Sequence, residues 1–325
     1  MPTFYNLYQT IWRATARGQR LLIVLSVIVA VLAAVPLKFQ QLVINSIVEH
    51  SDVAILAWLC FGFFASLLLG GTVKFGLYHK RSVLGERAIH LIRDRLYANY
   101  VKETAADTGS MPKRGALVTM LTSEAEAVGS FAGSAISEPL LLLGTLVSVL
   151  GFIVVSEPWL GLMAIVVTAP QAFIVAAIQR RINVRVGERV QVLRDASDRI
   201  LESDFKELES QIVDDFSQMF EIRRKIIFLT QSIKFMLRAM SAVGAVGFLF
   251  LGGWLVIAGQ TDVGTVVASL TGLARIEQIW RDLVACYRTA SVVRVQFAML
   301  LTVIAPGQGG PAERTDGVVA SSSRT

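Results

Sequence analysis

Charged residues are scarce in this sequence. Asp, Glu, Lys and Arg make up 17% of its 325 residues, and 54% of the residues are hydrophobic. A soluble domain of average composition carries about 25% charged residues. The apolar residues also gather in long runs, as they do in membrane-spanning helices. The composition therefore disfavours an ordinary soluble domain and predicts an integral membrane protein.

Cysteine and histidine are scarce as well. The two cysteines, Cys60 and Cys286, stand far apart in apolar surroundings and predict neither a disulfide framework nor a metal site. The three histidines, His50, His79 and His90, are dispersed without the spacing of metal ligands. The G-x-S-x-G and H-E-x-x-H motifs of hydrolases are also missing. We therefore expect no catalytic, cofactor or metal site on this chain.

A phosphate-binding loop is the most informative absence. No G-x-x-x-x-G-K-[ST] sequence occurs among the 325 residues. The backbone cradle and the lysine with which P-loop proteins hold ATP are thus lacking, and the chain is not expected to hydrolyse ATP by that mechanism. The net charge of +6 does not indicate nucleic acid either, because the basic residues lie beside apolar runs and not in one patch.

Several apolar runs have the length of membrane-spanning helices. Crossing the hydrocarbon layer takes about 20 mostly apolar residues in a helix. Five runs fit, and a sixth begins at Val263 but is interrupted by charges after Ala274. The five clear runs are Leu21–Leu37, Ala54–Leu77, Pro139–Val155, Trp159–Ile178 and Ala239–Ala258.

The basic residues decide between five spans and six. Residues 79–127 hold eight Lys or Arg and residues 180–232 hold ten, whereas the segments after the first, third and fifth runs hold at most Lys38. Cytoplasmic loops carry the excess of Lys and Arg, so the N-terminus is predicted to be cytoplasmic. Arginines from Arg275 to Arg324 follow the last run, which places the C-terminus there too and requires six spans. We expect a multi-pass protein of the plasma (inner) membrane.

The two basic segments are predicted to be helical excursions into the cytoplasm. In the first, apolar residues between Leu84 and Tyr100 recur every three to four positions, and the second repeats this between Phe205 and Phe220. The expected fold is therefore all-α, a polytopic membrane protein whose six spans continue into long cytoplasmic helices. The predicted domains are a cytoplasmic segment (1–20), a six-helix membrane domain (21–304) with excursions at about 79–127 and 180–232, and a disordered cytoplasmic tail (305–325), which is rich in Gly, Pro and Ser.

Six spans, short outer loops and two long excursions resemble the membrane domain of ABC exporters. The stretch Gly115–Glu124 is similar to the family's sequence after its first coupling turn, and Leu251–Gly264 is similar to the turn between its fifth and sixth helices. The first stretch departs from the family pattern: Ala116 stands where an acid is usual, Met120 where Arg is usual, and Glu124 where Asp is usual. The family's LSGGQ-type signature is absent.

The resemblance implies the partners and docking sites of this chain. Family members work as pairs of six-span bundles, so a homodimer or heterodimer is expected in the lipid bilayer. A separate nucleotide-binding ATPase subunit would carry ATP and magnesium and would drive transport of a small molecule, lipid or peptide. The turn that docks on this ATPase would comprise Asp107, Thr108, Gly109, Lys113, Arg114 and Gly115. A second docking segment would comprise Phe205, Leu208, Ile212 and Phe216.

Polar residues at membrane depth are the candidates for a substrate pathway, because a charge there costs about 2.5–3.5 kcal/mol on insertion scales. Glu277, Gln278 and Arg281 fall in the inner half of the predicted sixth span, with Glu277 and Arg281 at i,i+4 spacing. Glu138 lies at the inner edge of the third span, before Pro139. These residues line a water-filled pathway, or they face headgroups where the helices leave the membrane.

Three functions remain open on the sequence. The first is the permease subunit of an ABC-type transporter, powered by an ATPase on another chain. The second is a carrier driven by a proton or ion gradient on an exporter-like scaffold, which would need an essential carboxylate such as Glu138 or Glu277. The third is a membrane scaffold, or a degenerate exporter that does not transport.

Overall fold

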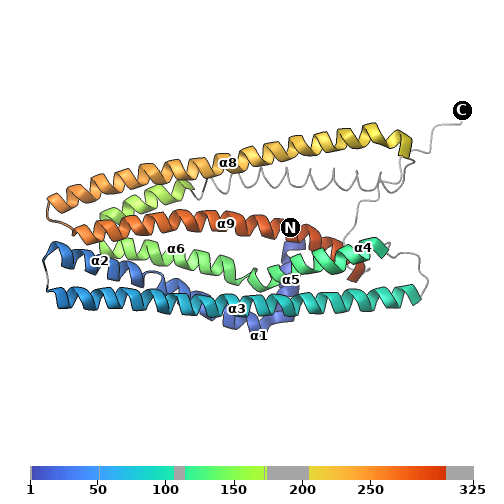
Figure 1. Cartoon of the computed structure of the whole chain (residues 1–325), viewed down its shortest axis with the longest axis horizontal. Helices are drawn as coiled ribbons and strands as arrows, with labels where there is room; N and C mark the ends of the chain where they lie inside the picture. Colours follow the sequence, from blue (N-terminus) through green and yellow to red (C-terminus); the bar gives the residue numbers. More distant parts are fainter. Residues whose placement is uncertain (1, 51, 106–113, 172, 174–204, 305–325) are drawn as a thin grey trace, which may run out of the picture. The chain divides into compact units, whose positions relative to one another are not determined.

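The structure is a computed structural model that describes residues 2–50, 52–105, 114–171, 173 and 205–304 (Figure 1). Helices make up nearly all of this part of the chain, and it contains no strand. The helices are α1 (Pro2–Leu32), α2 (Val35–Val48), α3 (Val53–Ala105), α4 (Arg114–Thr119), the π-helical turn η1 (Met120–Glu124), α5 (Ala125–Ser134), α6 (Ser137–Ser156), an unlabelled helix Pro158–Gln171, α8 (Phe205–Ile257) and α9 (Val263–Ile304). The all-α fold is confirmed.

Four helical stretches are long and apolar enough to cross a membrane. They are Gly18–Val48, Val53–Val101, Leu117–Ser156 and Phe220–Ile257. They contain the predicted first, second and third spans and all but the last residue of the fifth. The helix Pro158–Gln171 covers the described part of the predicted fourth span and is shorter. The predicted sixth span lies in the 42-residue helix α9, whose charged residues lower its hydropathy.

The chain divides into two compact units. The first comprises residues 1–23, 77–137 and 289–325, and the second comprises residues 24–76 and 138–288. The borders at Leu77 and Glu138 lie within one residue of the predicted inner ends of the second and third spans. The residues that the sequence assigns to the membrane thus belong mainly to the second unit. The predicted tail, 305–325, lies outside the described residues.

The second unit packs its spans around an apolar core. Val149 and Ile153 of α6, Leu160 of the following helix, Phe248 of α8 and Ile276 of α9 are all almost completely buried in one cluster. Large apolar side chains cover the outside too, as expected for helices that face lipid. Packing therefore comes from side-chain fit between helices, because lipid tails are as apolar as the core.

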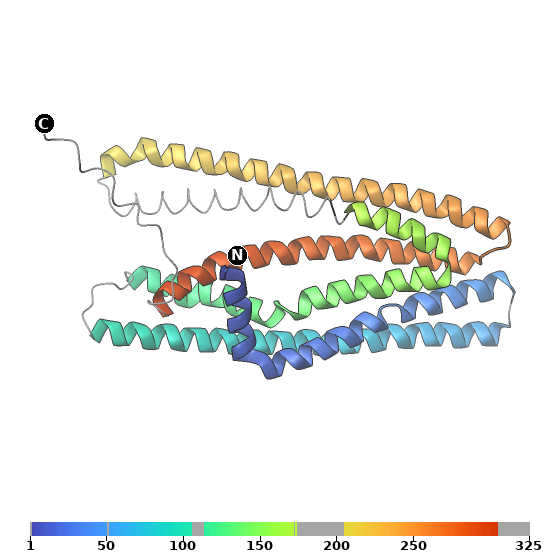
Figure 2. The same cartoon turned by 180° about the vertical axis from the view of Figure 1, so that it is seen from behind.

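Exposed tryptophans mark one end of the second unit. Trp58 lies near the start of α3, Trp159 near the start of the helix Pro158–Gln171, and Trp254 near the end of α8. Figures 1 and 2 show these helix ends at the same end of this unit. Tryptophan gathers at membrane–water interfaces, so the three side chains indicate where the spans leave the hydrocarbon.

The first unit joins α3 and α5 by close backbone contact. Gly129 and Gly133 of α5 are four residues apart and face α3, where a Cβ atom on Gly129 would lie 2.7 Å from the amide nitrogen of Ile89. A Cβ atom on Gly133 would meet the carbonyl oxygen of Arg81, and one on Gly85 would lie 3.3 Å from Cα of Ser130. Small residues at this spacing let two helices approach closely. The sequence analysis did not identify this contact.

The first span is longer than predicted and is broken. The sequence predicts an end at Leu37, but α2 continues to Val48 after a two-residue interruption at Ala33 and Ala34. Pro36 explains the interruption, since proline lacks an N–H and its ring clashes with the carbonyl four residues earlier. The span continues beyond Leu37 because the polar residues of α2 find partners on α9.

Candidate functional site

The predicted pathway residues of α9 form one network of polar side chains. Nη1 of Arg281 bonds to Oε1 of Glu277, while its Nε and Nη2 donate to Oε1 of Gln278 at 3.2 and 2.6 Å. Nε2 of Gln278 donates in turn to Oδ1 of Asp282 at 2.9 Å. The side chain of Glu277 is 18% exposed and that of Arg281 is 33% exposed. The structure thus brings Glu277, Gln278 and Arg281 together on one helix as a half-buried ion pair with polar neighbours.

A second arginine of α9 reaches the break in the first span. Nη1 of Arg275 donates a hydrogen bond of 2.7 Å to the main-chain oxygen of Ala33. Ala33 and Ala34 make only weak backbone bonds of their own, from their nitrogens to the oxygens of Ala30 at 3.3 Å and Val31 at 3.4 Å. The guanidinium therefore completes the C-terminal end of α1, where the helix dipole also favours a positive charge.

A row of polar contacts joins α2 to the first turns of α9. Nε2 of Gln41 donates to Oγ1 of Thr265 at 2.6 Å in a buried contact, and Nε2 of Gln40 donates to Oγ1 of Thr271 at 3.0 Å. Oδ1 of Asn45 accepts the backbone N–H of Gly264 at 2.8 Å. We call these contacts, together with the bond from Arg275 to Ala33, the α2–α9 seam. It lies within the second unit.

The sequence analysis missed this seam. Gln40, Gln41 and Asn45 follow the first apolar run at helical spacing, which was the available signal. Their partners on α9 lie more than 200 positions later in the chain, and no short-range pattern connects the two segments.

Glu138 lies at the start of a helix and apart in sequence from the α9 network. It is the second residue of α6, and Pro139 is the third. An acidic residue in the first turn is favoured by the helix dipole, and proline is tolerated there because the first N–H groups of a helix have no partner in the helix. This position accounts for Glu138 and Pro139 through helix geometry, and its pathway role stays a prediction.

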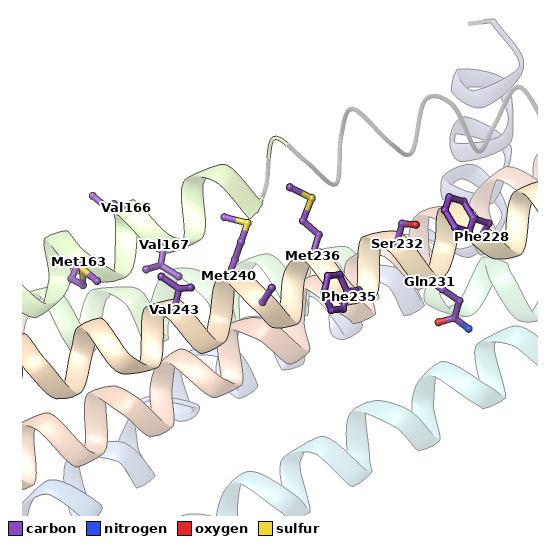
Figure 3. A pocket seen from close by; sticks show the side chains of 11 residues that line it. Met163, Val166, Val167, Phe228, Gln231, Ser232, Phe235, Met236, Met240 and Val243 are labelled. Atoms are coloured by element: carbon purple, nitrogen blue, oxygen red, sulfur yellow. The ribbon is translucent and has the colours of Figure 1, made fainter.

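An apolar groove of about 850 Å³ lies between the helix Pro158–Gln171 and α8. Met163 and Val167 line one side, and Phe235, Met240 and Val243 line the other (Figure 3). The α8 face that lines it continues toward Phe228, which is 72% exposed, while Phe235 is 75% exposed. Both phenylalanines precede the predicted fifth span, Ala239–Ala258, and lie within the apolar stretch Phe220–Ile257.

The predicted docking residues are only partly described. Asp107, Thr108, Gly109 and Lys113 lie outside the described residues, whereas Arg114 and Gly115 begin α4. Phe205, Leu208, Ile212 and Phe216 form the first turns of α8. The departures from the family pattern at Met120 and Glu124 coincide with the two ends of η1, a π-helical turn of the kind often found at functional sites.

A family model for the ABC transporter transmembrane region matches residues 20–203, more than half of the chain. The chain belongs to this family. It is therefore the transmembrane part of an ABC-type transporter and a multi-pass membrane protein. No curated protein matches the sequence. Among the residues that the structure describes, no group of three or more His, Cys, Asp or Glu side chains could hold a metal ion.

Proposed function

We propose that the chain is a permease subunit that forms a substrate pathway as a dimer and is driven by ATP hydrolysis on a separate nucleotide-binding protein. Membership of the ABC transporter transmembrane family carries this proposal. The 325 residues hold no phosphate-binding loop, so the ATP and magnesium would be bound by the partner. The subunit would lie in the plasma (inner) membrane with both termini in the cytoplasm.

The network on α9 supports a polar pathway. Charged residues within a span are tolerated where they face a water-filled cavity and pair with one another, and Glu277 and Arg281 are paired. In this proposal Glu277, Gln278 and Arg281 line the pathway, with Glu138 as a further candidate. The chemical class of the substrate stays open. Glu277 and Arg281 neutralise each other, so the network does not favour a substrate of one charge over the other.

The pathway proposal is tested by removing both charges together. Glu277→Gln with Arg281→Gln removes both charges but keeps polar side chains, and it should lower transport at least tenfold. Glu221→Gln with Arg224→Gln makes the same changes in an exposed pair on α8 at 2.9 Å and should leave transport unchanged. Surface pairs contribute little, so the second double variant is a matched control. Equal transport by both double variants would contradict a pathway along α9.

The exposed phenylalanines of α8 support the dimer. Phe228 and Phe235 are exposed before the predicted fifth span, and in this proposal the same face of a second copy of the chain covers them. In a background without Cys60 and Cys286, Phe235→Cys should form an oxidised dimer, and Phe250→Cys should not. Phe250 is also exposed but lies within the predicted fifth span, where lipid covers it.

The power source is tested by purification. The tagged chain, extracted in mild detergent, should bring with it a P-loop protein that hydrolyses ATP, and Arg114→Glu should weaken this association by reversing a charge in the docking turn. Purification of the chain alone, with transport that persists after ATP is depleted, would favour a gradient-driven carrier. Purification of the chain alone without any transport would favour a scaffold.

A further inference from the structure

We propose that Arg275 is a positioning residue that holds the break in the first span as a joint between α1 and α2. The proposal that this joint moves during transport rests on the function proposed above. The observation that carries it is the 2.7 Å hydrogen bond from Nη1 of Arg275 to the main-chain oxygen of Ala33, between residues 242 positions apart.

The break lies about midway along the apolar stretch Gly18–Val48. Backbone groups within a membrane must be satisfied by protein, because lipid offers no hydrogen bonds. Pro36 removes one donor from the helix, and the backbone ladder of α2 begins only where the nitrogen of Lys38 donates to the oxygen of Ala34 at 3.2 Å. A free carbonyl at this position requires a donor from another helix, and Arg275 supplies it.

Close contacts hold the chain on both sides of the break. Before it, a Cβ atom on Gly144 of α6 would lie 2.8 Å from Cβ of Ala30. After it, the ring of Phe39 fills the space over Gly62 of α3. The first half thus contacts α6 and the second half contacts α3, while Leu37, just after the break, lies in the core cluster with residues of α6 and α9. In this proposal the residues at the break and Arg275 set the angle between the two halves.

The part of α9 that carries Arg275 is anchored in the core. Its neighbours on the helix, Leu273, Ile276 and Ile279, are buried in the core of the second unit. One helical turn before it, Thr271 accepts the hydrogen bond from Gln40 of α2. A shift of α9 along its axis would therefore pull on α2 through Thr271 and on the end of α1 through Arg275. The joint couples the first span to the helix that carries Glu277 and Arg281.

Hydrogen exchange tests the role of Arg275 directly. In the purified chain in nanodiscs, Arg275→Gln should speed exchange of the amides of residues 33–40 about tenfold or more, the size expected for a lost bond from a charged donor. Amides of α6 should be unaffected. Arg281→Gln is the matched control, because it removes an arginine of α9 that does not contact the break.

A variant with a continuous first span keeps the hydrogen-exchange test informative even if Arg275→Gln folds poorly. Pro36→Ala restores an N–H to the helix and lets Ala33 and Leu32 bond within it. In the Pro36→Ala background, Arg275→Gln should change exchange less than twofold. Equal effects of Arg275→Gln with and without Pro36, or no effect in either background, would overturn the proposal.

Movement of the joint is tested in the complex with its ATPase. In a background without Cys60 and Cys286, spin labels at Val27→Cys and Ile47→Cys, two exposed positions on either side of the break, should change distance when magnesium-ATP is added. Pro36→Ala should abolish the change. An unchanged distance in a complex that hydrolyses ATP would refute the moving joint. Failure to purify any ATPase would refute the proposed power source instead and leave the exchange result to decide the role of Arg275.

Discussion

Two helix breaks, one in the first span and one before the third, differ in how their ends are stabilised. Both are two residues long, Ala33–Ala34 and Ala135–Ile136, and both are followed by a proline in the first turn of the next helix. At the first, an arginine 242 positions away donates to the open carbonyl. At the second, Oγ of Ser137 donates to the oxygen of Gly133 at 3.3 Å, only four residues back.

The first break depends on a donor that is distant in sequence, and the second break depends on a local one. Nε of Arg81 donates to Oγ of Ser137 at 3.1 Å, so an arginine supports the second break too, but through a local serine. The glycines of α5 also hold that region against α3. The second break is thus fixed by its own neighbourhood in the first unit, whereas the first break is held from α9. We therefore expect the second break to be rigid and the first to be adjustable, and substitutions at each should show this difference.

The largest effect is expected from Gly129→Val, which tests the rigid region. A Cβ atom at this position would lie 2.7 and 2.8 Å from the nitrogen and Cα of Ile89, and backbone atoms cannot turn aside. Overpacking of this kind costs about 3 kcal/mol, and thermal unfolding in detergent should show the loss. Gly151→Val, at a glycine with open space around it, is the control, and equal losses would mean that the close approach does not stabilise the fold.

Arg275→Gln should come next, with a loss of about 2 kcal/mol, the size of a hydrogen bond from a charged donor. The same measurement on Arg275→Lys should show a smaller loss, because lysine keeps the charge near the end of α1. Thermal unfolding in detergent compares the two variants. If Arg275→Gln lost less stability than Ser137→Ala, the first break would depend less on Arg275 than the second break depends on Ser137, and the comparison would be wrong.

Ser137→Ala should cost about 1 kcal/mol, since it removes one neutral hydrogen bond and the acceptor of Arg81. The loss should be confined to the first unit, and exchange of the amides of residues 33–40 should not change. Faster exchange at residues 33–40 in this variant would show that the two breaks are coupled.

Pro139→Ala should have the smallest effect, below about 0.5 kcal/mol. Proline in the first turn of a helix replaces an N–H that lacks a partner in the helix. The break before Pro139 is also already held by the bond from Ser137 to Gly133, so restoring the N–H there gains little. In the same experiment, Pro36→Ala should change amide exchange at the Ala33–Ala34 break more than Pro139→Ala changes it at the Ala135–Ile136 break. Equal and large effects of both substitutions would indicate that both prolines set moving joints.

Hydropathy and charge were enough to predict the all-α membrane fold and the apolar stretches. They could not predict that the first span continues to Val48, because the polar side chains of α2 appear unsuited to a membrane until Thr265 and Thr271 are seen beside them. The pairing of Glu277 with Arg281 followed from helical spacing. The bond from Arg275 to Ala33 depends on tertiary structure alone.

The central claim is that α9 crosses the membrane as a sixth span despite its charges. Accessibility of single cysteines to a membrane-impermeant reagent in sealed, right-side-out vesicles tests this directly. Cysteines at Gln260 and Asp52 should be labelled from outside, and tags at the two termini should be protected until the membrane is opened. A C-terminal tag that is labelled from outside while the N-terminal tag is protected would mean that α9 does not cross, and would contradict the account.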